Sequence, residues 1–431
     1  MSDGSESTFL LSWGRKPLAV DLRGWQVETV APGAGSTGLE DPRGAVLEAL
    51  DSPEGLPPFG EWLGNARTVA IVLPDDSRPH PWPELPRFLV EHLLSTGVDP
   101  GGVRIVLAPG AETFTGWKGH PLSGLRDLEG VEMLVHDPGD EAGLVPVGEV
   151  GRSGARSVAE GLLGEFVRLA GGQAPSPSRA RASAEAGRRR TLELSRVVAG
   201  ADRVIVASCV APHPLVGFTG AGHPLLPGAA GAASIAAHEE LGLLPTAGPG
   251  RTEGNPVREE ADEAARALGD AVLAVDAVPA RRGGVAGFAV GSPWLVAHVT
   301  TPLALETFGV QCRPAPSVIV SAAVDSLEAL VRTGAVAALA VQTTGTMLLA
   351  GDVTRIGRPE RVRRLFDAVL GPRLAGASVL VHTPLPAREV LRCGLMPVRS
   401  IASGLEVMGE RAGGDERIVV VPDALWTLPR I

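Results

Sequence analysis

Short apolar runs recur along this chain, and a segment with helix signals follows most of them. We expect strands within residues 66–76, 103–112, 131–140, 201–210, 316–323, 345–353, 377–385 and 417–424. Apolar strands that alternate with helices are typical of a mainly parallel sheet wound by helices. The sequence therefore predicts an α/β fold of two lobes, each a mainly parallel sheet wound by helices, with a cleft between them.

Helix starts and composition divide the chain further. Asp41 before a proline, and Asn255 before another, suit the cap and the first position of two helices. Residues 155–195 are rich in Pro, Ser, Ala and Arg, which predicts an exposed insertion that is partly flexible. We expect an N-terminal catalytic domain of residues 1–275 and a C-terminal α/β domain of residues 276–431.

Composition narrows the class of protein. The formal charge is 39 − 49 = −10, which argues against nucleic acid as the main partner. No apolar run is long enough for a transmembrane helix, and the first residues lack the pattern of a secretory signal. The three cysteines are far apart in the sequence and form no CxxC pair. They suggest a protein of the reducing cytoplasm without a disulfide framework. We expect a cytoplasmic protein whose partner is a small-molecule substrate, and neither nucleic acid nor a membrane. The sequence does not indicate its oligomeric state.

The segment from Pro212 to Glu239 concentrates residues that can carry chemistry, because a glycine-dense turn there follows a strand and precedes a helix. Glycines allow backbone to approach a ligand closely, and a helix start offers free N–H groups to a phosphate. Imidazoles can bind a metal or move protons, although their spacing here matches no standard zinc motif. The glycines are Gly217, Gly220 and Gly222, and the histidines are His213, His223 and His238.

Polar residues also follow two of the expected strands. In parallel sheets such positions face the crevice where α/β proteins bind ligands. Arg78 can clamp a carboxylate or phosphate, with Asp75 holding the arginine or a hydroxyl group. An Asp-capped turn with a surface ion pair explains the same residues. Glu112 can act as an acid or base, or can be a solvated side chain after a glycine turn.

Six segments, in this order along nearly the whole chain, resemble motifs of the nickel-dependent lactate racemase family, a group of 2-hydroxyacid racemases and epimerases. Their sequences are DDSRP, APGAE, LVHDP, PHPLVGFTGAGHPLLPG, EGNPVREE and GLMPVRSIASGLEVM. The resemblance implies two α/β lobes around a cleft. It also implies a nickel-pincer nucleotide, whose ring carbon takes the hydride from substrate C2 and returns it to either face.

The resemblance assigns roles to particular residues. Arg78 matches the arginine that engages the substrate, and Asp75 belongs to the same motif. His213 matches one of two catalytic acid/base histidines, and Glu112 occupies the place of the other. The residues that match the cofactor loop are Gly217, Gly220, Gly222 and His223.

Three positions depart from the family pattern. His223 stands where a lysine tethers the cofactor, and an imidazole cannot form that bond, so the resemblance implies noncovalent binding. Glu239 occupies the place of the nickel-binding histidine, and His238 lies one residue earlier, about 100° away around a helix. Arg332 falls near a lysine that contacts the substrate carboxylate.

Three hypotheses about function follow. The first is a racemase or epimerase of a 2-hydroxyacid-type substrate that holds a nickel-pincer nucleotide noncovalently. The second is a catalytically silent relative that binds a ligand. The third is a metal-dependent hydrolase or lyase that uses His213, His223 and His238.

Overall fold

The computed structural model describes residues 8–32, 37–74, 82–110, 112, 114, 116–118, 120–151, 188–366 and 377–431. Contacts between Cα atoms divide the chain into two compact units, which we call the larger and the smaller unit. The larger unit holds Ala34–Ala211 and Leu215–Thr307. The smaller unit holds Met1–Gly33, Pro212–Pro214 and Phe308–Ile431.

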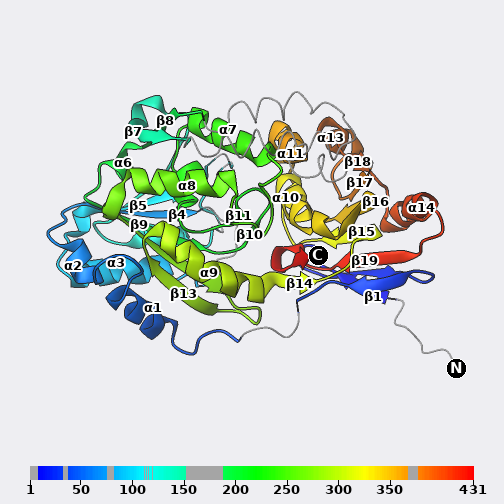
Figure 1. Cartoon of the computed structure of the whole chain (residues 1–431), viewed down its shortest axis with the longest axis horizontal. Coiled ribbons are helices and arrows are strands. Elements are labelled where there is room, and N and C mark those ends of the chain that lie inside the picture. Colours follow the sequence, from blue (N-terminus) through cyan, green and yellow to red (C-terminus); the bar gives the residue numbers. More distant parts are fainter. Residues whose placement is uncertain are drawn as a thin grey trace. The chain divides into compact units, whose positions relative to one another are not determined.

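The larger unit is built on a six-stranded sheet in the order β13-β12-β9-β4-β5-β6 (Figure 1). Neighbouring strands run parallel except β12 and β13, which are antiparallel. The strands are β4 (Val69–Pro74), β5 (Val103–Ala108), β6 (Glu132–Val135), β9 (Arg203–Cys209), β12 (Val272–Pro279) and β13 (Val285–Gly291). A separate antiparallel pair consists of β7 (Leu144–Val150) and β8 (Arg190–Ser195).

Helices cover both faces of this sheet. Ile71 and Leu73 of β4 belong to a core cluster with residues of α1, α2 and α3. Val72, between them, packs instead with residues of α6 and α8. Because successive strand residues point to opposite faces and both faces are covered, the central strands are mainly apolar. The helices are α1 (Pro42–Asp51), α2 (Phe59–Leu63), α3 (Leu85–Ser95), α6 (Arg196–Ala199), α7 (Ala232–Glu240), α8 (Pro256–Ala267) and α9 (Pro293–Phe308).

The smaller unit has its own six-stranded sheet, parallel throughout, in the order β18-β17-β16-β15-β19-β3 (Figure 1). Its strands are β3 (Gln26–Thr29), β15 (Ala315–Ser321), β16 (Val341–Ala350), β17 (Ser378–His382), β18 (Met396–Pro397) and β19 (Arg417–Val421). The helices are α10 (Leu327–Ala337), α11 (Pro359–Leu365), α13 (Ala387–Arg392) and α14 (Ile401–Ala412). Short pairs join β1 (Thr8–Leu11) to β2 (Leu18–Asp21), and β14 (Gly309–Gln311) to β20 (Leu428–Arg430).

These two sheets confirm the predicted α/β class with mainly parallel strands. The compact units, however, differ from the expected division at residue 276, which lies inside β12. The strand β3 near the N-terminus pairs with β19 near the C-terminus, and so the first residues belong to the smaller unit. Hydrogen bonding between strands far apart in the sequence, not chain order, decides this division.

The expected insertion ends in a regular strand. Of residues 155–195, those from 155 to 187 lie outside the described residues. The remaining part includes β8, which pairs with β7, so the end of the expected insertion is a regular strand. The helix α14 was not predicted, although Ser400 and Ser403 form a capping box at its start.

Candidate active site

Residues 217–230 are attached to the carboxyl ends of the parallel strands in the larger unit. Beyond β5, the Gly110 N–H donates to the Gly228 carbonyl at 3.0 Å. Beyond β6, Nε2 of His136 lies 2.9 Å from the Ala230 carbonyl oxygen. This edge of a parallel sheet is where α/β proteins bind ligands. The glycine-rich segment therefore lies where the sequence predicts a site.

Asp276 of β12 holds the same segment in place and was not predicted to do so. Its carboxylate accepts a hydrogen bond from the Ser208 hydroxyl at 2.6 Å and another from the Ala221 N–H at 2.8 Å. The side chain is fully buried, and burial raises the pKa of Asp276 to about 6, against the lowering effect of these two hydrogen bonds. The sequence signal that could have indicated this role is an aspartate inside the otherwise apolar strand VLAVDAVP.

Glu112 stands at the end of a turn that follows β5. Its N–H donates to the Pro109 carbonyl at 3.0 Å, and its side chain is half-buried. Gly110 has a φ of +60°, and a Cβ there would lie 3.2 Å from the Pro227 carbonyl oxygen. The turn that carries Glu112 is thus packed against the helical turn Pro224–Gly228, which begins next to His223. Two of the predicted site residues therefore lie on contacting segments.

The predicted cofactor-loop glycines are explained by contacts inside the protein. A Cβ at Gly217 would lie 2.1 Å from the Arg251 carbonyl oxygen, and one at Gly222 would lie 2.1 Å from that of Ala261. At Gly220 the φ is +98°, and a Cβ would lie 2.4 Å from Oδ2 of Asp276. Each glycine is required because other parts of the chain approach it closely. Cofactor binding by these glycines stays a prediction.

The predicted substrate-binding pair lies outside the described residues. Asp75 and Arg78 belong to residues 75–81, directly after β4 ends at Pro74. Next to that strand end is a small, mainly apolar cavity. It is lined by Leu73, Pro74, Trp82, Leu85, Pro86, Leu122, Ala207, Ser208, Cys209 and Ala277. The cavity gives this end of the sheet an apolar wall.

His213 and Arg332 belong to the smaller unit. The histidine is half-buried in the short strand β10 (Pro212–His213), which contacts α10. Arg332 is on α10 and is only 7% exposed. The fold therefore brings together the segments that carry two predicted site residues distant in sequence.

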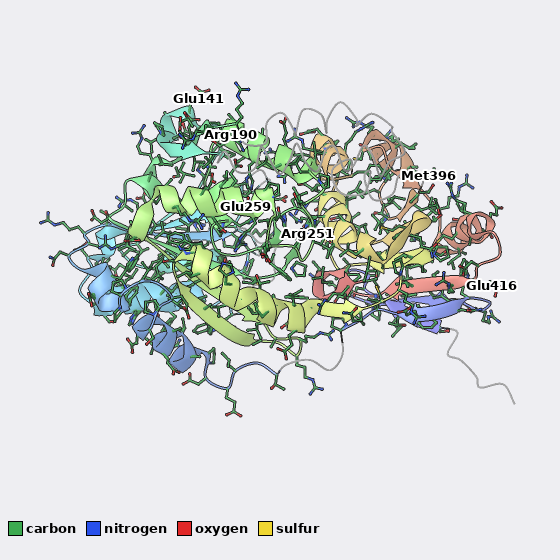
Figure 2. All side chains as sticks on the ribbon, viewed as in Figure 1. Glu141, Arg190, Arg251, Glu259, Met396 and Glu416 are labelled. Carbon is green, nitrogen blue, oxygen red and sulfur yellow. The ribbon has the colours of Figure 1, made fainter. Side chains whose placement is uncertain are left out.

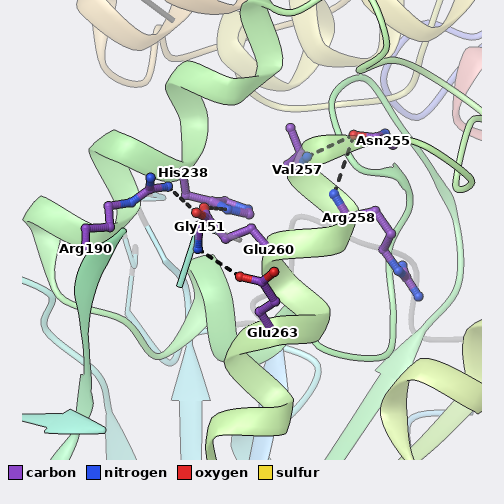
Figure 3. A network of polar contacts seen from close by, with 8 residues as sticks. All are labelled: Gly151, Arg190, His238, Asn255, Val257, Arg258, Glu260 and Glu263. Atoms are coloured by element: carbon purple, nitrogen blue, oxygen red, sulfur yellow. Dashed lines mark hydrogen bonds and ion pairs between the residues drawn. The ribbon is translucent and has the colours of Figure 1, made fainter. Parts of the chain in front are cut away.

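His238 of α7 lies in a buried polar network with α8 and β8 (Figure 3). Its Nδ1 is 2.8 Å from Oε2 of Glu260, and both side chains are about 3% exposed or less. Arg190, the first residue of β8 and labelled in Figure 2, forms an ion pair with Oε1 of the same carboxylate. Nε2 of His238 is buried and has no hydrogen-bond partner among the described residues. Sequence reasoning missed Glu260 and Arg190, because only the tertiary contact shows their relation to His238.

Asn255 shapes the start of α8 beside this network (Figure 3). Its side-chain oxygen accepts hydrogen bonds from the N–H groups of Val257 and Arg258, as predicted for a helix cap. Its amide also donates to the carbonyls of Leu215 and Arg251, at 2.7 and 2.8 Å. The cap therefore ties α8 to the glycine-rich segment.

Within the described ranges, no three His, Cys, Asp or Glu side chains are grouped in a way that could hold a metal ion. His213, His223, His238 and Glu239 are all within those ranges. The hydrolase or lyase hypothesis, which requires three converging imidazoles, stays a prediction. Nor does any helix of the described ranges have the length and hydropathy needed to cross a membrane.

A comparison with protein families decides the identity. The model of the lactate racemase N-terminal domain matches residues 13–160 and 183–248. The chain belongs to the lactate racemase family. This match confirms the family that the six sequence segments indicate. A search of curated proteins finds no match to this lactate racemase-family chain.

Solved structures agree on the fold of this family member. The lactate racemase apoprotein from Thermoanaerobacterium thermosaccharolyticum has a TM-score of 0.76 and 19% identity, covering 98% of this chain and 100% of that chain. A protein from Thermotoga maritima has a TM-score of 0.62 and 15% identity, covering 86% of this chain and 95% of that chain. At this level of identity the likeness concerns the fold.

Proposed function

We propose that this lactate racemase-family protein is a racemase or epimerase of a 2-hydroxyacid-type small molecule and holds a nickel-pincer nucleotide noncovalently. The observation that carries the proposal is the buried Nε2 of His238, which has no hydrogen-bond partner in the part of the chain that the structure describes, while Nδ1 contacts a carboxylate. A metal-binding histidine usually has this pattern, with one ring nitrogen on the metal and the other on a carboxylate or carbonyl.

The residues present fit the cofactor in one respect and alter its attachment in another. His238 offers a borderline-soft imidazole nitrogen, a ligand type that suits nickel. His223 has no amine, so it cannot form the covalent tether of the family pattern, and binding must rest on noncovalent contacts. When bound, such a group supplies a ring carbon that accepts a hydride from substrate C2.

The chain itself would supply positioning and proton transfer. Arg78 and Arg332 suit the substrate carboxylate, because a guanidinium can donate two parallel hydrogen bonds to it. Glu112 and His213 are the proposed bases for the substrate hydroxyl proton. Because these two bases differ, they suit an epimerase better than a racemase. The apolar wall beside β4 suits a small apolar substituent on the substrate.

The test is purification from cells that make the cofactor, followed by measurement of nickel, cofactor absorbance and deuterium exchange at C2 of 2-hydroxyacids. We expect nickel, a cofactor band and an exchange that His213→Ala reduces by about 100-fold or more. A protein without nickel and without the cofactor band would contradict the proposal.

A catalytically silent relative is the second candidate. It is favoured by His223, which removes the covalent tether, and by the absence of a grouped metal site in the described residues. In that case the contacts of His238, Glu260 and Arg190 serve only to join α7, α8 and β8. This candidate predicts no nickel and no C2 exchange, and exchange that is lost in His213→Ala would exclude it.

A further inference from the structure

We infer that Glu260, supported by Arg190, is a positioning residue that sets the tautomer of His238 and directs its Nε2 lone pair at the nickel. This inference rests on the proposed function. It also selects His238, and not Glu239, as the metal ligand. The contacts that support it come from three elements, α7, α8 and β8, and converge on one carboxylate (Figure 3).

The first step concerns the proton on the ring. A carboxylate is an acceptor, so the Glu260 oxygen 2.8 Å from Nδ1 requires that nitrogen to carry the hydrogen. A neutral imidazole with its proton on Nδ1 has its lone pair on Nε2. Glu260 thereby prepares the nitrogen that a metal needs.

The second step concerns the carboxylate. Glu260 is 3% exposed, and a buried carboxylate is unfavourable without partners. Arg190, whose side chain is 16% exposed, pairs with one oxygen and leaves the other to His238. The arginine therefore fixes which oxygen faces the ring and keeps the carboxylate from rotating away.

The third step concerns the unused nitrogen. An ion-pair network that merely joined two helices would need only Nδ1, and a buried Nε2 without a partner would destabilise it. A ligand at Nε2 accounts for this atom. The direction of the ring also matters, because adjacent helix residues point about 100° apart and it is the His238 ring that lies 2.8 Å from Glu260.

The decisive experiment measures the tautomer by ¹⁵N NMR of the full chain labelled on histidine and purified without cofactor, with His238→Gln identifying the signal. We expect the His238 ring to carry its proton on Nδ1, the nitrogen 2.8 Å from Glu260. In Glu260→Gln the side-chain amide can donate to Nδ1, and we expect the proton to move to Nε2. Glu263→Gln is the matched control, because Glu263 is on the same helix but accepts from the Gly151 N–H at 2.8 Å.

Nickel retention after loading is the second readout. We expect Glu260→Gln to weaken it 10- to 100-fold, as for other partners of metal-binding histidines, and Glu263→Gln to leave it unchanged. A wild-type His238 whose proton is on Nε2 and not on Nδ1 would overturn the inference without any variant having to fold. So would equal nickel loss in the two variants. A wild-type protein that takes up no nickel would overturn the proposed function, whatever its tautomer.

Discussion

At the scale of single residues, Asp276 is the clearest example of a side chain whose role depends on its surroundings. It lies in the middle of an apolar strand and is fully buried, yet it receives hydrogen bonds from Ser208 and Ala221. Burial disfavours the charged form more than these donors favour it, and so the pKa rises. The same carboxylate touches Gly220, which makes it part of the glycine-rich segment's geometry.

The raised pKa of Asp276 predicts a pH dependence of stability. The pKa rises from 3.8 to about 6 on folding, so the folded state binds the proton more tightly between these values. The contribution of Asp276 to the free energy of unfolding should therefore decrease as pH rises from 4 to 6, by up to about 3 kcal/mol, and be constant above. Urea unfolding of the wild type and Asp276→Asn across this range measures it. A stability difference between the two proteins that does not change with pH would contradict this assignment.

Gly222 gives a second prediction at this scale. A methyl group there would meet the backbone of Ala261 in α8, which cannot move aside like a flexible side chain. We expect Gly222→Ala to lower the free energy of unfolding by about 2 kcal/mol or more. Gly60→Ala is the control, because Gly60 is an exposed helix residue with nothing near its Cβ position. Equal effects in chemical denaturation would show that Gly222 does not pack against α8 in this way.

At the scale of elements, α8 shows how one side chain can serve two elements. Asn255 caps the helix and also holds the carbonyls of Leu215 and Arg251. We expect Asn255→Ser to keep the cap and lose the two carbonyl contacts, at a cost of about 1–3 kcal/mol. Asn255→Ala should cost about 1 kcal/mol more, because the cap is lost as well. Thermal or urea unfolding separates the two terms, and equal stabilities of the Ser and Ala variants would argue against the cap.

Short-range sequence patterns predicted some of the helices and strands but not others. The caps Asp41 and Asn255 and the apolar strands were predicted, because each depends on residues within a few positions. The strand β8 and the helix α14 were not predicted. For β8 the misleading signal was composition, since the Arg-rich stretch before it resembles a flexible insertion, while its paired residues in β7 are forty or more positions away.

At the scale of the whole molecule, strands near the two ends of the sequence, β3 and β19, pair in one sheet. The Gln26 N–H donates to the Glu416 carbonyl at 2.9 Å, and the Val30 N–H donates to the Val420 carbonyl at 2.8 Å. The first residues thus complete the edge of the smaller unit's sheet. A division by chain order, such as 1–275 and 276–431, separates β3 from its partner.

This pairing can be tested by removing residues 1–32 and comparing the shortened protein with the full-length chain. The change exposes the edge of β19, and we expect faster amide hydrogen exchange there because the strand loses a neighbour. The strands β4 and β9 of the larger unit should keep their protection. Faster exchange in β4 and β9 with no change in β19 would support the division at residue 276 instead.

For the candidate site, the sequence predicted where the glycine-rich segment lies on the sheet but not its contacts. The order of strand, glycine turn and helix placed residues 217–230 at the carboxyl ends of parallel strands, because that position follows from the α/β pattern. The α/β pattern did not indicate which residues surround each side chain of this segment. Whether His238 or Glu239 points inward depends on a carboxylate contributed by a different helix.

The sequence by itself determined the α/β class, most strands and helices, two helix caps and the lactate racemase family, since these depend on short-range periodicity and on motifs within one segment. Only the tertiary structure decided that β3 joins β19, that Asp276 holds the glycine-rich segment, and that Glu260 and Arg190 meet at His238. The physical reason is that these contacts join residues far apart in the chain, where packing and hydrogen bonding select partners that local sequence does not specify.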